Sequence, residues 1–244
     1  MAEVSKSVSK LWRRRRSRWR KLIEPPPPVY HNPTERIIER NYRLGRWNLY
    51  IGGAGARIPD FVNVDLFPLH GVDVVCSAEQ LPFRRDLFRW VECDAVLEHV
   101  EDADAVVSEI ERCLEVGGLA HLVVPFCHPF HEYPRDFRRL TLDGLRQFCR
   151  GRLHCVSSGW RTGPAATWIV FTVEFVKAWS EALWWRRLVH VLLGWLLFPL
   201  RYLDALLITK PCADRLGNHA FIYAVKTGAP RISPSTTTEK ASSL

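Results

Sequence analysis

The segment from Pro125 to Thr141 carries a dense set of polar and aromatic side chains that could do acid–base chemistry. His131 is our first candidate for a general base and His128 the second, because an imidazole titrates close to neutral pH. Asp136 could orient or polarise that imidazole, and Arg138 could bind an anionic part of a substrate. The same side chains could instead form a structural network that ties the loop to the body of the protein. The sequence leaves both interpretations open.

Small and acidic residues follow the first two apolar runs of the chain. Gly52-Gly53-Ala54-Gly55 comes directly after one run, where the missing β-carbons would let the backbone turn sharply and approach a ligand. Asp65 ends the next run, where its carboxylate could accept hydrogen bonds from both hydroxyls of a ribose. A third run ends at Ser77, at the edge where open α/β sheets bind ligands. Each feature also has a structural interpretation, as a turn or a helix cap.

Short apolar runs alternate with turns beyond Gly45 and predict the strands that must position these residues. We expect strands at Asn48–Ile51, Phe61–Leu66, Val72–Cys76, Trp90–Asp94, Leu119–Phe126 and Phe221–Lys226. One helix should begin at Asp102 or Asp104 and end at Gly117, and a second should run from Thr141 to Cys149. This alternation is typical of an α/β fold with a mostly parallel sheet, and the apolar density of the runs indicates helices on both faces.

Residues 160–218 interrupt this alternation, and we predict a helical insertion before the last strand. The segment contains Trp160, Trp168, Trp179, Trp184, Trp185 and Trp195 among the ten tryptophans of the chain. From Leu188 to Ile208 the expected helix is apolar nearly all round, with a kink at Pro199. Such a helix is either buried or in lipid. A cap over a cleft, a dimer interface and a membrane contact therefore stay open.

The order of these elements and three short motifs resemble the class I S-adenosylmethionine-dependent methyltransferases, in particular their type 11 group. The motifs are Ala78-Glu79-Gln80-Leu81-Pro82-Phe83, Val96-Leu97-Glu98-His99-Val100 and Glu115-Val116-Gly117-Gly118. The resemblance extends from Trp47 to Gly159, with a closing strand near Phe221. It implies a Rossmann-like sheet, S-adenosylmethionine as the cofactor and methyl transfer as the reaction.

The resemblance also implies roles for individual residues. The cofactor would contact Gly52, Gly53 and Gly55 at its methionine and ribose portion, Asp65 at the ribose, Ala78 and Glu79 at the adenine, and Leu97 beneath it. Methyl transfer is an in-line displacement, so the protein mainly aligns the nucleophile and excludes water. His131, or His128 in second place, would take the proton of a hydroxyl acceptor with the help of Asp136. The acceptor would contact Arg138, Glu98 and His99, although the last two could simply brace the site.

Three features depart from the family pattern. Tyr50 stands two places before the first glycine, where the family usually has an acidic residue that reaches the amino group of the cofactor. About nine residues, Gly52 to Asp60, separate the first two strands, fewer than the roughly 10–12 of a crossover with its helix. Ser77 stands where the family often has aspartate. A non-catalytic, methyltransferase-like membrane or complex adaptor is therefore the alternative to an enzyme.

The positive charge of the chain is concentrated at its beginning. Residues 1–24 hold nine Lys or Arg against two Glu, which is +7 of the net charge of +8. On a helix, one apolar stripe would contain Val4, Val8, Leu11, Trp12, Trp19, Leu22 and Ile23. This pattern is typical of an amphipathic arm on an anionic membrane surface, which we favour over nucleic-acid binding and over a disordered tail.

The proline run Pro25–Pro28 should separate this arm from the rest of the chain. We expect a proline-rich linker over residues 25–33, a methyltransferase domain over 34–228 and a disordered tail over 229–244. The oligomeric state stays open.

The seven cysteines are scattered and lack a Cys-x-x-Cys spacing, which indicates reduced thiols in a cytoplasmic protein. We predict no metal site, with Cys127, His128 and His131 as the less favoured alternative. The N-terminus has no apolar run typical of a secretory signal, and no stretch reaches about 18 uninterrupted apolar residues. We therefore expect a cytoplasmic protein, peripheral on the inner face of the membrane, that acts on a small-molecule or lipid-linked acceptor.

Overall fold

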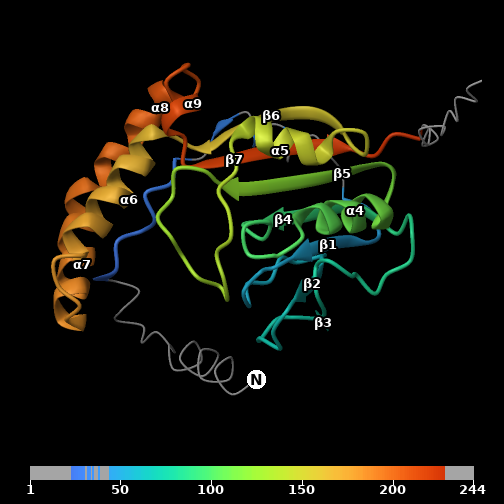
Figure 1. Cartoon of the computed structure of the whole chain (residues 1–244), viewed down its shortest axis with the longest axis horizontal. Coiled ribbons are helices and arrows are strands. Elements are labelled where there is room, and N and C mark those ends of the chain that lie inside the picture. Colours follow the sequence, from blue (N-terminus) through green and yellow to red (C-terminus); the bar gives the residue numbers. More distant parts are fainter. Residues whose placement is uncertain (1–22, 31, 34, 36–37, 39–43, 229–244) are drawn as a thin grey trace, which may run out of the picture.

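The computed structural model describes residues 23–30, 32–33, 35, 38 and 44–228, so most of the basic arm and the whole C-terminal tail lie outside the described residues. One seven-stranded sheet organises the rest, in the order β3-β2-β1-β4-β5-β7-β6 (Figure 1). The strands are β1 Asn48–Ile51, β2 Val62–Asp65, β3 Val74–Val75, β4 Phe88–Asp94, β5 Leu114–Pro125, β6 His154–Thr162 and β7 His219–Val225. Only β7 runs antiparallel to its neighbours, which confirms the mostly parallel α/β fold.

The strands bury side chains on both faces of the sheet, as their apolar density predicted. Helices α4 (Ala103–Cys113) and α5 (Leu142–Cys149) pack on one face, where the larger apolar core lies. On the other face, Trp90, Leu119, Val123, Phe221 and Tyr223 form a smaller cluster with Ile38 and Phe61. Both helices are capped as expected, because Asp102 accepts the Ala105 N–H and Thr141 accepts the Gly144 N–H.

The end of α4 differs from the prediction. The helix stops at Cys113, and Leu114 is already the first residue of β5, opposite Phe88 of β4. Gly117 lies inside the strand with φ +78°, and its N–H donates to the Lys226 carbonyl beyond the end of β7. The glycine therefore serves an irregular turn within a long strand rather than a helix terminus.

The first three strands follow one another without helices. Every residue from Gly52 to Leu87 is described, and none of them lies in a helix. Because β1 and β2 are nevertheless parallel neighbours, the chain returns from the end of β1 to the start of β2 through this helix-free loop. The short first crossover seen in the sequence is thus a structural feature, and it leaves the glycine-rich turn close to the end of β2.

The insertion begins later than predicted, because residues 160–162 belong to β6, a strand that the sequence analysis did not predict. This edge strand is polar and largely exposed at its start, so it gives little apolar signal. The helices that follow are α6 Pro164–Lys177, α7 Leu183–Leu197, the 3₁₀ helix η1 Phe198–Leu203, α8 Asp204–Leu207 and α9 Ala213–Leu216. The change from α7 to η1 occurs next to Pro199, which lacks the N–H that an α-helix needs there.

Helices α6 and α7 pack against each other at one side of the molecule (Figure 1). Their shared contact is small and apolar, and it contains Ile169, Val173 and Leu197 with Leu193 and Leu200 at its margin. Thr162, the last residue of β6, and Pro125, the last residue of β5, both pair with His219. The helical group that follows Thr162 therefore extends from the edge of the sheet where β5 ends.

Candidate functional site

A pocket lies at the carboxyl edge of the parallel strands, where open α/β sheets bind ligands. Its empty volume is about 560 Å³, including space open to solvent. Its lining residues come from the ends of β1, β2, β3 and β4 and from the loop after β5: Ile51, Gly52, Val64, Asp65, Leu66, Phe67, Cys76, Ser77, Ala78, Ala95, Val96, His99, Val100, Tyr133 and Pro134. The sequence predictions for Gly52, Asp65, Ala78 and His99 therefore meet in one place.

Gly52 allows the chain to turn at the floor of this pocket. Its φ is +74°, and a β-carbon there would lie 2.2 Å from Cγ2 of Val96. Gly55 also has a positive φ, whereas Gly53 packs against the ring of Tyr50. Neither Gly53 nor Gly55 is among the lining residues, so of the three predicted glycines only Gly52 faces the pocket directly.

Asp65 connects the glycine-rich turn to the end of β2. One carboxylate oxygen accepts the Ala54 N–H at 2.9 Å, and the other accepts the Phe67 N–H at 3.0 Å. The side chain is almost completely buried at the wall of the pocket. Each carboxylate oxygen has two lone pairs, so Asp65 keeps acceptor capacity for a ligand hydroxyl.

Two other predicted cofactor residues have different positions. Glu79 is not a lining residue, because its carboxylate turns toward α4 and accepts the Asp102 N–H at 2.9 Å. It therefore holds the start of that helix, and its expected contact with an adenine stays a prediction. Leu97 is fully buried in the larger core and supports the site from below without lining the pocket.

The loop after β5 folds over the pocket and is held by its own charged residues. The Asp136 carboxylate accepts the His131 N–H at 2.8 Å and forms an ion pair with Arg139, and this pairing lowers the pKa of Asp136 to about 2. The Arg138 guanidinium donates to the carbonyls of Leu97 and Glu101. Both side chains fasten the loop. Asp136 also lies where its predicted role in orienting His131 requires, with Oδ2 3.6 Å from Nδ1 of His131, while the expected contact of Arg138 with an acceptor stays a prediction.

Tyr133 is a lining residue that the sequence analysis missed. Its ring packs edge-on against Phe67, and burial together with the nearby Asp65 charge raises the pKa of its hydroxyl. The aromatic composition of the loop was the available signal. It did not identify Tyr133 because only the fold brings this loop over the end of β2.

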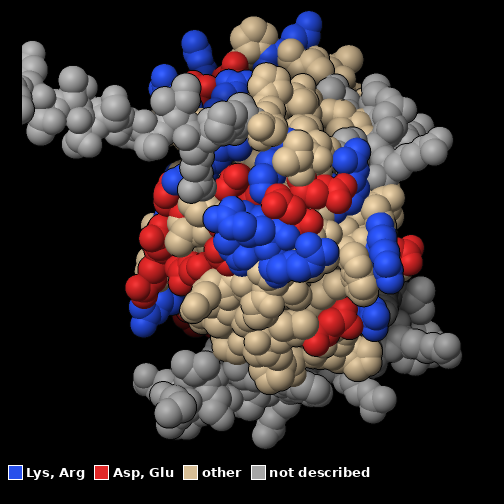
Figure 2. Space-filling model, turned by 90° about the vertical axis from the view of Figure 1, so that its right-hand side faces the viewer, with Lys and Arg blue, Asp and Glu red and all other residues tan. Residues whose placement is uncertain are grey.

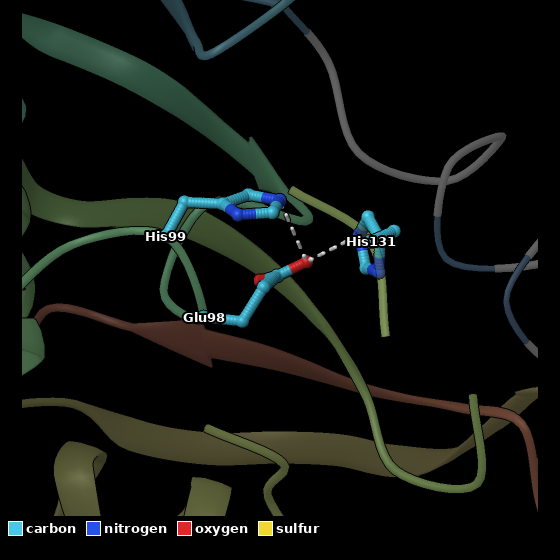
Figure 3. A group of neighbouring side chains, drawn as sticks. All are labelled: Glu98, His99 and His131. Atoms are coloured by element: carbon cyan, nitrogen blue, oxygen red, sulfur yellow. Dashed lines mark ion pairs between the residues drawn. The ribbon is translucent and has the colours of Figure 1, made fainter. Parts of the chain in front are cut away.

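Glu98, His99 and His131 form a compact group beside the pocket (Figure 3). The Glu98 side chain is only 1% exposed, and its Oε1 lies 3.6 Å from Nε2 of His99 and 3.7 Å from Nε2 of His131. Interaction with the Glu98 carboxylate raises the pKa of His131, although burial opposes this effect. We call these three residues the Glu98 cluster.

His128 lies outside the Glu98 cluster, although its ring contacts that of His131. Its Nδ1 lies 3.0 Å from Oδ1 of Asn218, and burial lowers its pKa. His128 is therefore predominantly neutral near pH 7, but it is not a pocket residue. The structure thus places His99, rather than His128, beside Glu98 together with His131.

Comparisons with known proteins agree with this geometry. Residues 61–122, which contain Asp65, Ala78 and the Glu98-His99 pair, match the family model of the methyltransferase domain. No curated protein matches the chain. Among solved structures, the [4+2]-cyclase SpnF is similar with a TM-score of 0.51 and 13% identity over 80% of each chain.

Two methyltransferase structures are similar at lower scores. The 1,6-didemethyltoxoflavin-N1-methyltransferase of Burkholderia thailandensis has a TM-score of 0.46 and 14% identity over 80% of this chain and 77% of that one. The geranyl diphosphate C-methyltransferase of Streptomyces coelicolor has a TM-score of 0.47 and 15% identity over 79% and 77%. The family-model match over residues 61–122 bears out the resemblance of the chain to the class I S-adenosylmethionine-dependent methyltransferases.

Proposed function

We propose that this protein transfers a methyl group from S-adenosylmethionine to an oxygen of a hydrophobic or lipid-linked acceptor at a membrane surface. The observation that carries the proposal is the pocket in which Gly52, Asp65 and Ala78 meet at the carboxyl edge of the sheet. The family match covers the strands and loops on three sides of that pocket.

The residues of the pocket fit such a cofactor. Gly52 gives backbone access at a position where any side chain would collide with Val96. Asp65 retains lone pairs for ribose hydroxyls, and Ala78 leaves space beside Ser77 at the end of β3. When bound, S-adenosylmethionine would supply a methyl group already activated by its sulfonium.

A hydroxyl acceptor must lose its proton as the new bond forms. We assign that task to the Glu98 cluster, because His99 lines the pocket and His131 lies against the same carboxylate. The loop that carries His131 also places Tyr133 and Pro134 over the pocket, where they help to exclude water. Cofactor binding, proton removal and the exclusion of water are therefore assigned to three separate parts of the chain.

Helices α6 and α7 support a membrane location for this chemistry. Large exposed apolar side chains recur along them: Trp168, Phe171 and Phe175 on α6, Trp179 in the turn that follows it, and Trp184, Leu188, Leu192, Trp195 and Leu196 on α7. The stretch Leu183–Leu207 is long and apolar enough to cross a membrane by length and composition, because it contains an 18-residue window with a mean hydropathy of 1.3, of which 11% is buried. Soluble monomers rarely expose such a surface, so we propose that lipid covers it.

The basic arm begins from the same side of the molecule. The indole N–H of Trp195 donates to the Ile23 carbonyl at 2.9 Å, and Pro25 packs against Gly194 of α7. Residues 1–22 themselves lie outside the described residues. An arm that leaves α7 can reach the anionic headgroups of a membrane into which α7 inserts.

The end of the molecule opposite α6 and α7 carries many charged side chains. Figure 2 shows the face turned away from α6 and α7, where acidic and basic side chains are intermixed. All seven cysteines are described and none is paired in a disulfide, in keeping with a reducing compartment. We therefore place the catalytic domain on the cytoplasmic side, peripheral to the inner face of the membrane.

Calorimetry with S-adenosylmethionine tests the cofactor proposal. We expect the full-length protein to bind it, and Asp65→Ala to weaken binding by roughly tenfold or more because charged hydrogen-bond acceptors contribute about 1.5–3 kcal/mol. Asp73→Ala is the matched control. Asp73 also accepts a backbone N–H at this side of the sheet, from Asn63, but it is not a pocket residue.

Two results would overturn the cofactor proposal. A folded wild type that binds no S-adenosylmethionine at millimolar concentration would favour the non-catalytic adaptor. Equal losses in the Asp65 and Asp73 variants would show that Asp65 acts only through the fold of this sheet edge.

A further inference from the structure

The Glu98 carboxylate is buried without an adequate partner. Its side chain is 1% exposed, and among the described residues neither of its oxygens has a hydrogen-bond donor. An isolated carboxylate in such a place is costly, so native proteins neutralise it with a proton, a charged side chain or a metal ion. The ring nitrogens of His99 and His131 lie close to it, and the Arg139 guanidinium interacts with its charge without a hydrogen bond.

The hydrogen bond of His99 determines which of its nitrogens faces Glu98. Nδ1 lies 2.5 Å from the Arg135 carbonyl, which can only accept, so Nδ1 carries the proton. In the neutral ring, Nε2 then presents a lone pair toward Oε1 of Glu98 at 3.6 Å. The lone pair on Nε2 of His99 and the lone pairs on Oε1 of Glu98 repel each other across this gap. They therefore require a cation, a proton or a metal ion, between them.

His131 faces the same carboxylate from the other side, with its Nε2 3.7 Å from Oε1 of Glu98. Its Nδ1 lies 3.4 Å from the Pro129 carbonyl, 3.6 Å from the Asp136 carboxylate and 3.5 Å from Nη2 of Arg139. Histidines that bind metals commonly have a carbonyl or carboxylate behind the second nitrogen, which fixes the tautomer and the ring orientation. Both histidines of the Glu98 cluster have such backing.

The spacing of the three side chains fits shared ligation better than direct hydrogen bonding. Distances of 3.6 and 3.7 Å exceed the usual 2.7–3.2 Å of an N–H···O bond. Two ligands at about 2.0–2.1 Å from a tetrahedral zinc ion are about 3.3 Å apart. The three ligand atoms all lie within 4.8 Å of one another, so small side-chain movements would complete the geometry.

We propose that Glu98, His99 and His131 bind a divalent transition-metal ion such as Zn²⁺. Two imidazoles and one carboxylate suit zinc and neighbouring first-row metals better than Mg²⁺ or Ca²⁺, which prefer oxygen ligands. Three protein ligands leave a fourth position open, and His99 places it beside the pocket. A metal there would lower the pKa of a coordinated hydroxyl, the task that the proposed function gives to this cluster.

The cation site stands on the geometry of the cluster and does not require methyl transfer. The sequence analysis predicted no metal site because the ligands come from two segments, Glu98-His99 after β4 and His131 after β5. Its less favoured set of Cys127, His128 and His131 is not the one that the fold assembles among the described residues.

Titration of the chelator-stripped, full-length protein with Co²⁺ and Zn²⁺ tests the site. We expect one Co²⁺ per chain with visible ligand-field absorption, displaced by one Zn²⁺ in calorimetry. Glu98→Gln and His99→Ala should each weaken Zn²⁺ binding by roughly tenfold or more, judged against the 10–100-fold losses seen even for residues behind the ligands. Circular dichroism and urea unfolding would confirm that the variants fold.

Two control variants separate this site from other histidines. His154→Ala removes an exposed histidine on β6, and His128→Ala removes the one whose ring contacts His131 outside the cluster. Both should bind Zn²⁺ as the wild type does. Absence of stoichiometric Co²⁺ binding by the wild type, or unchanged binding by Glu98→Gln, would overturn the site and identify the shared cation as a proton. Either result would leave the cofactor proposal standing.

Discussion

At the scale of single residues, His121 has the most unusual surroundings. It is fully buried on the second face of the sheet, with Nδ1 2.8 Å from Glu92, Nε2 3.2 Å from Glu35 and its ring stacked on Tyr223. Arg161 forms ion pairs with Glu35 on the same face. Burial alone would lower the pKa of His121, but the two carboxylates raise it to about 9. The imidazolium is therefore part of the folded structure at neutral pH.

This pairing predicts a stability that depends on pH. Because the folded pKa of His121 lies above the unfolded value of about 6.5, its contribution is complete below pH 6.5 and is lost as the pH rises through about 9. The free energy of unfolding should fall by about 3 kcal/mol over that window, and by much less in His121→Gln. Urea titrations at several pH values measure both, with His154→Gln as the control. Parallel curves for wild type and His121→Gln would contradict this assignment.

Residue roles could be predicted where a side chain directly follows a strand. Gly52, Asp65 and Ala78 line the pocket because parallel strands end at one edge of the sheet. The contacts of Arg138 with the carbonyls of Leu97 and Glu101 could not be predicted, because these groups become neighbours only in the fold. No local pattern reveals such contacts.

At the scale of elements, a distant carboxylate holds the start of α6. Gly163 provides no side chain to cap the helix, and Asp204 instead accepts the N–H groups of Gly163, Ala165 and Ala166. A β-carbon at Gly163 would lie 2.5 Å from Oδ1 of Asp204. This contact fastens α6 to α8 and so fixes the angle at which the insertion leaves the sheet.

Removing this cap should loosen the insertion. We expect Asp204→Ala to lower the free energy of unfolding by about 2–4 kcal/mol, because three buried N–H groups lose their acceptor. Hydrogen exchange at Ala165 and Ala166 should become faster. Asp204→Asn keeps one acceptor oxygen and should lose less. If Asp204→Ala unfolds at the same urea concentration as the wild type, the cap does not contribute to stability.

Regular elements with a clear apolar pattern were predicted well, and irregular ones were not. Strand β1 and the end of α5 at Cys149 agree with the structure, because their side chains alternate or recur toward one core. Strand β6 was missed because it is an edge strand with a polar start, and Gly117 was misplaced because strand pairing begins before it. Long-range pairing decided both cases.

At the scale of the whole molecule, large exposed apolar side chains gather on α6 and α7. The amino edge of the parallel strands carries ion pairs such as Arg89 with Glu115 and Lys226 with Asp86, whereas α6 and α7 extend from the opposite edge. The pocket opens on that opposite edge as well. A positive net charge is compatible with nucleic-acid binding. The membrane interpretation came from the position of that charge in residues 1–24. A lipid-borne acceptor would thus meet the side of the molecule where the pocket lies.

Vesicle flotation tests this orientation. Full-length protein should float with vesicles that contain anionic lipid, and the triple variant Trp184→Gln, Leu188→Gln, Leu192→Gln should partition about 100-fold less, since each side chain loses roughly 1 kcal/mol of apolar burial. Deletion of residues 1–24 should remove mainly the salt-sensitive part of binding.

The matched control replaces three exposed valines outside the insertion, Val75, Val116 and Val156, by glutamine. It should float like the wild type, because those residues lie on β3, β5 and β6 rather than on α6 or α7. If the full-length protein stays unbound and instead forms a dimer that the α7 triple variant disrupts, a second copy covers the helices and the membrane proposal is wrong. Because lipid binding and self-association respond to the same three substitutions, sedimentation without vesicles must accompany the flotation to tell them apart.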